Sequence, residues 1–235
     1  MGSFTREQGL KVLRIVKKVF DELGIPLFLV DGTCISAIRD NDLNLTDIDL
    51  GVLGEYENRC DEIRKSILNY GAKVLVWTKP QVGAENELWI REQSKFQGTY
   101  YHYTSINKKL FISFVIDGVW VDILFYYRYG NYVWRMQNPR MLAVYSGELF
   151  NSFKEIDFFG MKMLVPNPPE KYLEEQYGNW RTPIPRPFCC GEFLMGEPRC
   201  GKCGKVYPNL YSDYKTEGVK RAERMKLWEI LKESS

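Results

Sequence analysis

The sequence has little of what several protein classes require. It contains one histidine, His102, so catalytic triads built on histidine have little support. Its formal net charge is only +2, with 32 basic and 30 acidic side chains, which gives no case for a nucleic-acid partner. No uninterrupted apolar run of about 18 residues is present, so the sequence predicts no transmembrane helix. A small molecule or a neutral acceptor is the partner that this composition favours.

The N-terminal residues also lack targeting motifs. The stretch MGSFTREQGLKVL contains no apolar region of the signal-peptide kind. Arg6 stands where N-myristoylation needs serine or threonine. Six cysteines in 235 residues are too few for a disulfide scaffold. We therefore expect a cytoplasmic protein.

What the sequence does contain is enough apolar material for one large domain. Hydrophobic residues make up 45% of the chain and aromatic residues 14%. In chain order, the residue pattern predicts a helix at 5–23, a strand at 27–31, a short helix at 33–39, a strand at 47–53, a helix at 56–70, a strand at 72–77, a hairpin at Asp117-Gly118, a hairpin at 147–165, a helix at 169–177 and a last helix at 215–232. This mixture predicts an α+β or α/β fold.

The hairpin at Asp117 has a predicted register. A two-residue turn there would pair Ile116 with Val119 and Ser113 with Asp122. Asp117 itself is interpreted as a turn residue and no more.

Two aspartates lie inside an apolar strand of the predicted fold. Asp47 and Asp49 alternate with Ile48 and Leu50, and alternate residues of a strand project to the same face. Asp122 lies in a second apolar strand, VWVDILF, where a solitary carboxylate costs free energy unless it is paired or binds a cation. Such carboxylates suit Mg²⁺ or Mn²⁺, and three of them could hold two ions that clamp phosphate oxygens. An Asp-x-Asp alone is also common on solvated strand faces.

The stretch before these aspartates is typical of a phosphate site. Gly32 and Thr33 lie where a predicted strand meets a short helix, which leaves backbone N–H groups for an anion. Gly32 permits close backbone approach, while Thr33 and Ser36 offer hydroxyl groups. Arg39 could contact a phosphate oxygen or be a solvated cation that favours the helix dipole. Asp31 is interpreted as a strand-end or turn residue.

This order of motifs resembles a known superfamily. Gly-Thr at a strand–helix corner, Asp-x-Asp on the next strand and a later Asp on a third resemble nucleotidyltransferases of the DNA polymerase β type. More narrowly, DGTCISAIRDNDLNLTDIDLGV resembles the LicD/fukutin-related family, in which Ser36 is usually glycine. A second similar stretch is GMKMLVPNPPEKYLEEQYGNWRTP, residues 160–183, so the resemblance covers most of residues 25–185. The positions that match in the first stretch are Gly32, Thr33, Ala37, Arg39, Asp47 and Asp49.

The resemblance implies a fold, an activity and a site. The fold is a mixed β-sheet flanked by helices, in a catalytic domain at residues 1–185. The activity is metal-dependent transfer of a phosphorylated alcohol, such as phosphocholine or ribitol phosphate, from a CDP-activated donor to a sugar hydroxyl of a glycan. Asp122 could also accept the proton of that hydroxyl as a general base. The implied metal ligands and catalytic residues are Asp47, Asp49 and Asp122, and the implied donor-phosphate residues are Gly32, Thr33, Ser36 and Arg39.

Four cysteines cluster near the C-terminus. Cys200-Gly-Lys-Cys203-Gly has the form of half a zinc knuckle, and the adjacent Cys189 and Cys190 would supply the other half. A closed four-thiolate site has no open position for a substrate, so this Zn²⁺ would be structural. A redox pair, reactive thiols or another ligand in place of one cysteine are the alternatives. Residues 186–235 are then a zinc-bound loop and a helix packed on the same domain.

Further residues and functions have more than one interpretation. His102 is more often a strand residue than a base, and Trp180 with Arg181 could stack on a base or sugar or be packed in the core. Cys34 and Cys60 are expected to be buried apolar residues. Two other functions are compatible with the pattern: nucleotidyl transfer, which places NMP from an NTP on a small molecule, protein or RNA, and a non-catalytic binding module. The sequence says nothing about oligomeric state.

Overall fold

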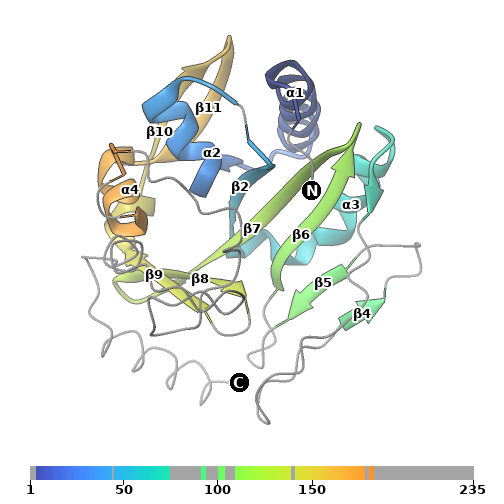
Figure 1. Cartoon of the computed structure of the whole chain (residues 1–235). Coiled ribbons are helices and arrows are strands. Elements are labelled where there is room, and N and C mark those ends of the chain that lie inside the picture. Colours follow the sequence, from blue (N-terminus) through green and yellow to red (C-terminus); the bar gives the residue numbers. More distant parts are fainter. Residues whose placement is uncertain are drawn as a thin grey trace, which may run out of the picture.

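A mixed β-sheet forms the centre of the protein, with helices packed against it (Figure 1). The structure is a computed structural model that describes residues 4–43, 45–74, 91–93, 100–103, 109–138, 141–177 and 180–182. The helices are α1 (Arg6–Glu22), α2 (Asp31–Ile35), α3 (Cys60–Leu68) and α4 (Pro169–Tyr177). A π-helical segment, η1 (Ser36–Asp40), continues α2, and two 3-10 segments are η2 (Gly54–Arg59) and η3 (Gly147–Phe150).

Eleven strands belong to this sheet within the described ranges. They are β1 (Phe28–Leu29), β2 (Asp47–Leu53), β3 (Lys73–Val74), β4 (Arg91–Gln93), β5 (Tyr100–Tyr103), β6 (Lys109–Ile116), β7 (Val119–Tyr129), β8 (Tyr132–Asn138), β9 (Met141–Ser146), β10 (Phe153–Phe158) and β11 (Met161–Pro166). Their main order is β10-β11-β1-β2-β7-β6-β5-β4, and β3 pairs with β6. The β1–β11 and β2–β7 pairs are parallel, whereas the other pairs are antiparallel.

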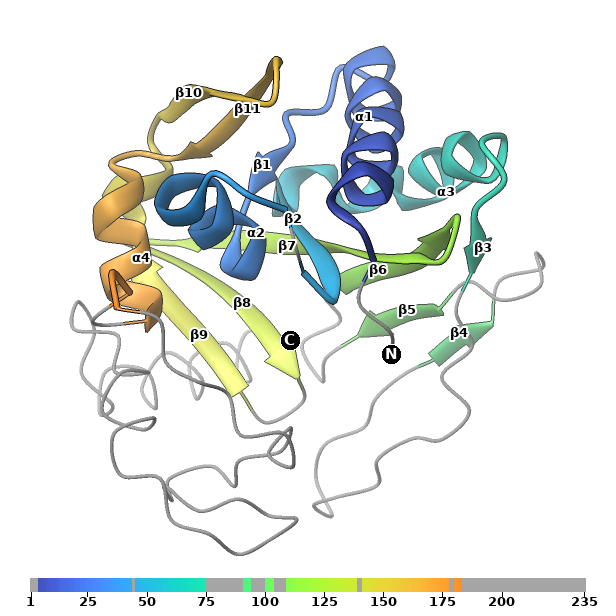
Figure 2. The same ribbon diagram turned by 45° about the horizontal axis from the view of Figure 1, so that its top comes forward.

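The helices pack at two places on the sheet. Helices α1 and α3 contact each other, and α1 packs on β7. Helices α2 and α4 also contact each other, and α4 reaches both β9 and β11 (Figure 2). Strands β8 and β9 form a ribbon that continues from the end of β7, beside α4 (Figure 2). This arrangement brings β8, α2 and α4 close to the central pair of parallel strands.

Helix α1 shows why the apolar stripe predicted a helix. Thr5 and Gln8 form a capping box, in which the Thr5 hydroxyl accepts the Gln8 N–H and the Gln8 side chain accepts the Thr5 N–H. The stripe residues Leu13, Val16 and Phe20 are fully buried. Burying side chains of this size stabilises the fold by about 1.5–3 kcal/mol each. The helix is therefore held by its packed face.

The central strands separate apolar from acidic side chains. Ile48 and Leu50 of β2, with Val121 and Ile123 of β7, are fully buried on one face of the sheet. Alternate residues point to the opposite face, which carries the aspartates. The predicted register of the β6–β7 hairpin is confirmed, with Ile116 opposite Val119 and Ser113 opposite Asp122.

The turn of this hairpin is also as predicted, with one addition. Asp117 and Gly118 both have positive φ values, 49° and 81°, which suit a tight two-residue turn. Asp117 in addition binds Lys11 of α1, with 2.6 Å between the Lys11 ammonium and the carboxylate. The expectation that Asp117 is only a turn residue is therefore wrong, although an exposed pair of this kind contributes little to stability.

Some predicted bounds hold and others are corrected. The strand at 47–53 and the helix at 169–177 have the predicted bounds. The strand predicted at 27–31 is only Phe28–Leu29, because Asp31 already begins α2. The helix predicted at 56–70 is η2 followed by α3, and η3 precedes the β10–β11 hairpin. The predicted helix at 215–232 and the residues after 74 of the strand at 72–77 lie outside the described residues.

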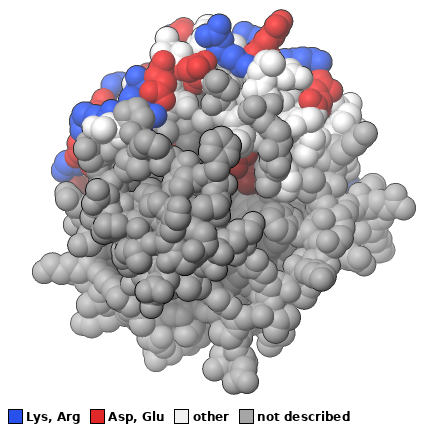
Figure 3. Space-filling model, in the orientation of Figure 1, with Lys and Arg blue, Asp and Glu red and all other residues white. Residues whose placement is uncertain are grey.

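The surface of the described residues carries both signs of charge. In Figure 3, acidic and basic side chains are interspersed over the described part of the visible face. None of the helices in the described ranges combines the length and apolar character that crossing a membrane requires.

Candidate active site

The structure brings the three sequence-predicted aspartates together. Asp47 and Asp49 lie on β2, and Asp122 lies on the neighbouring parallel strand β7, directly opposite Asp49. One carboxylate oxygen from each residue lies within 4.8 Å of the others, and all three side chains are partly buried. A divalent cation requires oxygen ligands from several directions at short range, and this cluster offers three. These residues could therefore hold a metal ion.

Burial and mutual repulsion make the cluster costly without a cation. The pKa of Asp49 is raised well above its usual value, first by burial and then by the charges of Asp31, Asp47 and Asp122. Burial is also the main cause that raises the pKa of Asp122 to about 6, although two hydrogen bonds oppose it. Carboxylates in this state bind protons readily unless a cation replaces the proton. The electrostatics fit a metal site.

Two donors fix the orientation of Asp122. The Ser113 hydroxyl from β6 and the Trp120 indole N–H from β7 both donate to Oδ1 of Asp122, the second at 2.9 Å. Because both donors take the same oxygen, Oδ2 is the atom that faces a metal ion most readily. Asp47 accepts a hydrogen bond at 2.8 Å from the neighbouring Thr46 hydroxyl. The predicted register places Ser113 opposite Asp122, and the structure adds its role as a hydrogen-bond donor to this carboxylate.

The Gly32-Thr33 corner lies against Asp49. A Cβ atom on Gly32 would lie 3.3 Å from Oδ2 of Asp49. The Thr33 hydroxyl oxygen accepts the backbone N–H of Asp49 at 2.8 Å, which ties α2 to β2. Thr33 and Ser36 are both buried, at 0% and 6% exposure. Thr33 therefore connects the corner to the acidic strand, and Gly32 leaves room for the carboxylate.

Arg39 contacts other groups in this structure. Its Nε and Nη2 atoms donate to the two carboxylate oxygens of Asp40 at 2.7 and 2.8 Å, and Nη1 donates to the backbone oxygen of Trp180 at 2.9 Å. Trp180 is 6% exposed, and the Arg181 guanidinium lies 4.4 Å from the centroid of its ring. Trp180 is thus packed in the core, which was the alternative to stacking on a base or sugar.

Sequence reasoning missed a buried ion pair beside the cluster. Asp31 is 8% exposed, and Arg135 of β8 is fully buried with its Nη2 atom 2.7 and 2.5 Å from the two Asp31 oxygens. The Tyr172 hydroxyl accepts the Asp31 N–H and donates to Asp31 Oδ1, both at 3.2 Å. Asp31 has a φ of 44° and is the first residue of α2, so the expectation of a strand-end or turn residue is corrected, and its charge is buried as well. A lone arginine in an otherwise apolar strand, YVWRM, is the pattern that could have indicated Arg135.

Other predicted residues lie apart from the cluster or outside the described chain. Cys34 and Cys60 are buried, as predicted, and burial raises the pKa of the Cys34 thiol. The predicted zinc ligands Cys189, Cys190, Cys200 and Cys203 lie outside the described residues. His102 lies in β5, which confirms the prediction of a strand residue, whereas the zinc site stays a prediction.

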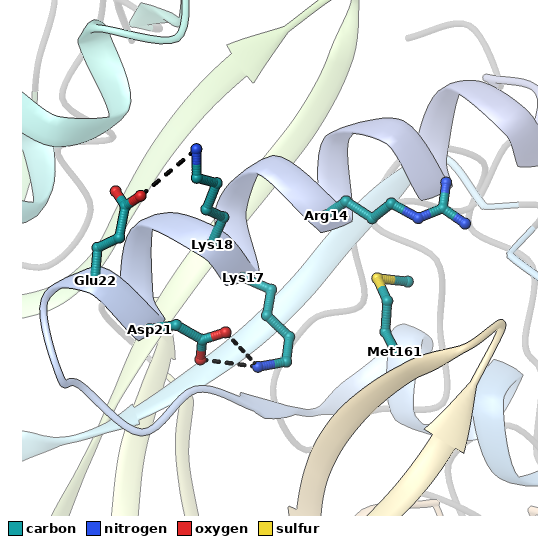
Figure 4. Close-up of a pocket in the computed structure, with 6 residues that line it drawn as sticks. All are labelled: Arg14, Lys17, Lys18, Asp21, Glu22 and Met161. Carbon is teal, nitrogen blue, oxygen red and sulfur yellow. Dashed lines mark hydrogen bonds and ion pairs between the residues drawn. The ribbon is translucent and has the colours of Figure 1, made fainter.

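A hollow on α1 is a weaker candidate. It has a volume of about 300 Å³ and is lined by Arg14, Lys17, Lys18, Asp21, Glu22 and Met161 (Figure 4). Lys17 binds Asp21 at 2.6 Å, and Lys18 lies 3.5 Å from Glu22. These lysines are neutralised by their own helix neighbours, and the hollow contains none of the three clustered aspartates.

Replacing Gly32 by alanine tests the fit of this corner. The added methyl group would press on Oδ2 of Asp49 at 3.3 Å and displace the carboxylate by a few tenths of an ångström. We expect Mn²⁺ affinity, measured by titration calorimetry, to fall about tenfold, the lower range for disturbing the surroundings of a metal ligand. Gly71→Ala, at the turn after α3, controls for lost stability: its φ of 79° makes an alanine strained there, so the melting temperature should fall while Mn²⁺ affinity stays unchanged. Equal affinity in Gly32→Ala would show that Gly32 does not confine the Asp49 carboxylate.

Comparison with known proteins identifies distant relatives. No protein-family model matches the chain. The ribitol-5-phosphate transferase FKTN of Macaca fascicularis is 24% identical over 185 residues, which are 76% of this chain and 34% of that protein. The Homo sapiens protein of the same name is 23% identical over the same shares. The chain thus spans about a third of the length of these relatives.

Two solved structures are similar at a low level. A Thermotoga maritima protein described as a nucleotidyltransferase has a TM-score of 0.39 and 16% identity, and the likeness covers 72% of this chain and 83% of that one. The structure of ANT(2″)-Ia in complex with adenylyl-2″-tobramycin has a TM-score of 0.39 and 15% identity, over 67% of this chain and 68% of that one. TM-scores this low do not establish a shared fold. The architecture of this chain is defined by the order and register of its own strands.

Proposed function

We propose that this chain is a metal-dependent transferase that moves a phosphorylated alcohol from a CDP-activated donor to a sugar hydroxyl of a glycan. The observation that carries the proposal is the cluster of Asp47, Asp49 and Asp122, with one oxygen of each within 4.8 Å of the others. The transferred group would resemble ribitol phosphate or phosphocholine. The distant relatives named ribitol-5-phosphate transferase favour a group of this kind. The fold would then be nucleotidyltransferase-like.

The residues of the cluster would hold one or two Mg²⁺ or Mn²⁺ ions. When bound, such ions neutralise the charge of a diphosphate and of the leaving nucleotide. The acceptor hydroxyl oxygen would attack the phosphorus that carries the alcohol, the bond from this phosphorus to the CMP oxygen would break, and CMP would leave. Asp122, with its pKa raised to about 6, would accept the hydroxyl proton.

The donor diphosphate would lie at the Gly32-Thr33 corner. Gly32 is adjacent to Asp49, so a phosphate there would also reach the metal. Thr33 and Ser36 are buried, and Arg39 is bound to Asp40. These three residues would form the wall of the phosphate corner, and they would bind the phosphate directly only if the donor displaced their present contacts. The proposed catalytic domain is residues 1–185. A structural Zn²⁺ on Cys189, Cys190, Cys200 and Cys203, within residues 186–235, stays a prediction, as does a cytoplasmic location.

The test combines ligand binding with product analysis. Thermal-shift measurements with Mn²⁺ or Mg²⁺ and either CDP-ribitol, CDP-choline or an NTP show which donor binds, because a ligand of the native state raises its melting temperature. We expect a shift of the melting temperature with a CDP-alcohol that requires the divalent metal. Turnover with a glycan acceptor should then release CMP.

Other outcomes of this test would change the assignment. Release of pyrophosphate from an NTP would establish nucleotidyl transfer instead. If no nucleotide shifts the melting temperature with either metal, the chain is a binding module without this activity. Asp21→Asn, an exposed carboxylate on α1, is a matched control that should behave as the wild type.

A further inference from the structure

The residues before and after Asp31 in the chain both contact Asp49 of β2. The Val30 N–H donates to the backbone oxygen of Asp49 at 3.4 Å. On the other side, Gly32 approaches Oδ2 of Asp49, and Thr33 accepts the Asp49 N–H. Asp31 is therefore flanked in the chain by Val30 on one side and by Gly32 and Thr33 on the other, and all three lie against Asp49. The Asp31 side chain thus begins from a stretch of backbone that borders Asp49.

The Asp31 carboxylate is nevertheless directed to other partners. Arg135 Nη2 binds both of its oxygens at 2.7 and 2.5 Å, and the Tyr172 hydroxyl binds Oδ1 at 3.2 Å. Among the residues that the structure describes, Asp31 is absent from the group of carboxylates that meet within 4.8 Å. Asp31 takes a left-handed conformation, φ 44°, which non-glycine residues adopt only when their surroundings hold them there.

Arg135 is anchored in place by its own contacts. It is fully buried, its Nε atom donates to the Tyr145 hydroxyl at 3.3 Å, and its guanidinium carbon lies 5.7 Å from the centroid of the Tyr126 ring. Tyr145 in turn donates to Gln176 of α4 at 2.5 Å. A buried arginine held by β8, β9 and α4 cannot follow Asp31 toward the metal. The ion pair therefore fixes where the Asp31 carboxylate can go.

We propose that Arg135 is a positioning residue of the metal site, which holds the Asp31 carboxylate away from Asp47, Asp49 and Asp122. The cluster is thereby kept at three carboxylates. Coordination positions that a fourth carboxylate would fill stay available for water and for the phosphate oxygens of a donor. This inference rests on the metal site of the proposed function.

The test measures Mn²⁺ rather than turnover. In Arg135→Met, Asp31 loses its cation and becomes free to bind the metal. We expect Mn²⁺ affinity to rise about tenfold, because affinity follows the number of charged ligands. Loss of a nearby positive charge alone would also raise affinity, so the number of water molecules on Mn²⁺, measured by electron–nuclear double resonance, is decisive. We expect it to fall by at least one relative to the wild type.

Further variants separate positioning from folding. The double variant Asp31→Asn/Arg135→Met removes both charges, and its Mn²⁺ affinity and hydration should return to wild-type values. Arg64→Met removes another buried arginine, one that pairs with Asp61 on α3, and should lower the melting temperature without changing Mn²⁺ hydration. If Arg135→Met does not fold, Arg135→Gln removes the cation and keeps a polar side chain at this buried position, and it should change hydration in the same direction.

The outcomes are distinguishable from those of the proposed function. Unchanged Mn²⁺ hydration in Arg135→Met, or in Arg135→Gln where only that variant folds, overturns the positioning role and leaves the metal site standing. A wild-type protein that binds no Mn²⁺ overturns the metal site and the positioning role together.

Discussion

Asp49→Asn is expected to abolish metal-dependent turnover while it stabilises the metal-free protein. Asp49 is the central member of the cluster, beside Asp47 on its own strand and opposite Asp122 on the next. Loss of about 4 kcal/mol of metal-derived stabilisation of the transition state would lower kcat about 10³-fold. The same substitution removes a charge that burial and three neighbouring carboxylates disfavour.

The two effects have opposite signs, which makes the prediction specific. An asparagine at position 49 has no ionisation cost, so the free energy of unfolding without metal should rise. Each kcal/mol gained would raise the melting temperature by about 2–4 °C in a chain of this size. Mn²⁺, which should raise the melting temperature of the wild type, should leave that of Asp49→Asn unchanged.

Calorimetry with and without Mn²⁺, and kcat with the donor found by screening, check both effects. A variant that keeps full metal-dependent activity would show that Asp49 is not a ligand. If the metal-free variant were less stable than the wild type, Asp49 would stabilise the fold by more than the repulsion from its neighbouring carboxylates destabilises it.

The sequence predicts those features that depend on neighbours along the chain. The strand at 47–53 follows from apolar residues at every second position, and the register of Ser113 opposite Asp122 follows from the Asp117-Gly118 turn. Alternation then places Asp47 and Asp49 on one face. The joint position of the three aspartates needs one further fact, the parallel pairing of β2 with β7, which the pattern along the chain does not contain.

The parts that could not be predicted depend on contacts between distant segments. Asp31 and Arg135 are 104 positions apart, and only the fold of β8 over α2 brings them together. Asp31 was interpreted as a strand-end or turn residue, whereas it begins α2, and its buried charge could not be inferred without its partner. Arg39 had two interpretations from sequence. In the structure it binds Asp40 and the backbone oxygen of Trp180, and the second contact exists only because the fold brings Trp180 next to η1.

Metal binding should depend strongly on pH, because Asp49 and Asp122 both have raised pKa values and must lose their protons to bind an ion. Burial raises this pKa from an ordinary value of 3.8 to about 6 in the folded protein. Between these two values the folded protein keeps a proton that the unfolded chain has lost. The contribution of Asp122 to stability is therefore fully present below pH 3.8 and is lost as the pH rises through 6. The loss amounts to about 3 kcal/mol, since one pKa unit corresponds to 1.36 kcal/mol.

Divalent metal should reverse this trend, because a carboxylate must lose its proton to bind the ion. As the pH rises through 6, the stability of the metal-free protein should fall while the increment from Mn²⁺ should grow. Unfolding by urea at pH 5 and pH 7.5, with and without Mn²⁺, measures both quantities. Subtracting the same data for Asp122→Asn removes the contributions of other titrating groups. A Mn²⁺ increment of equal size at the two pH values would mean that the ion does not bind at Asp122, since only a site there must expel this proton.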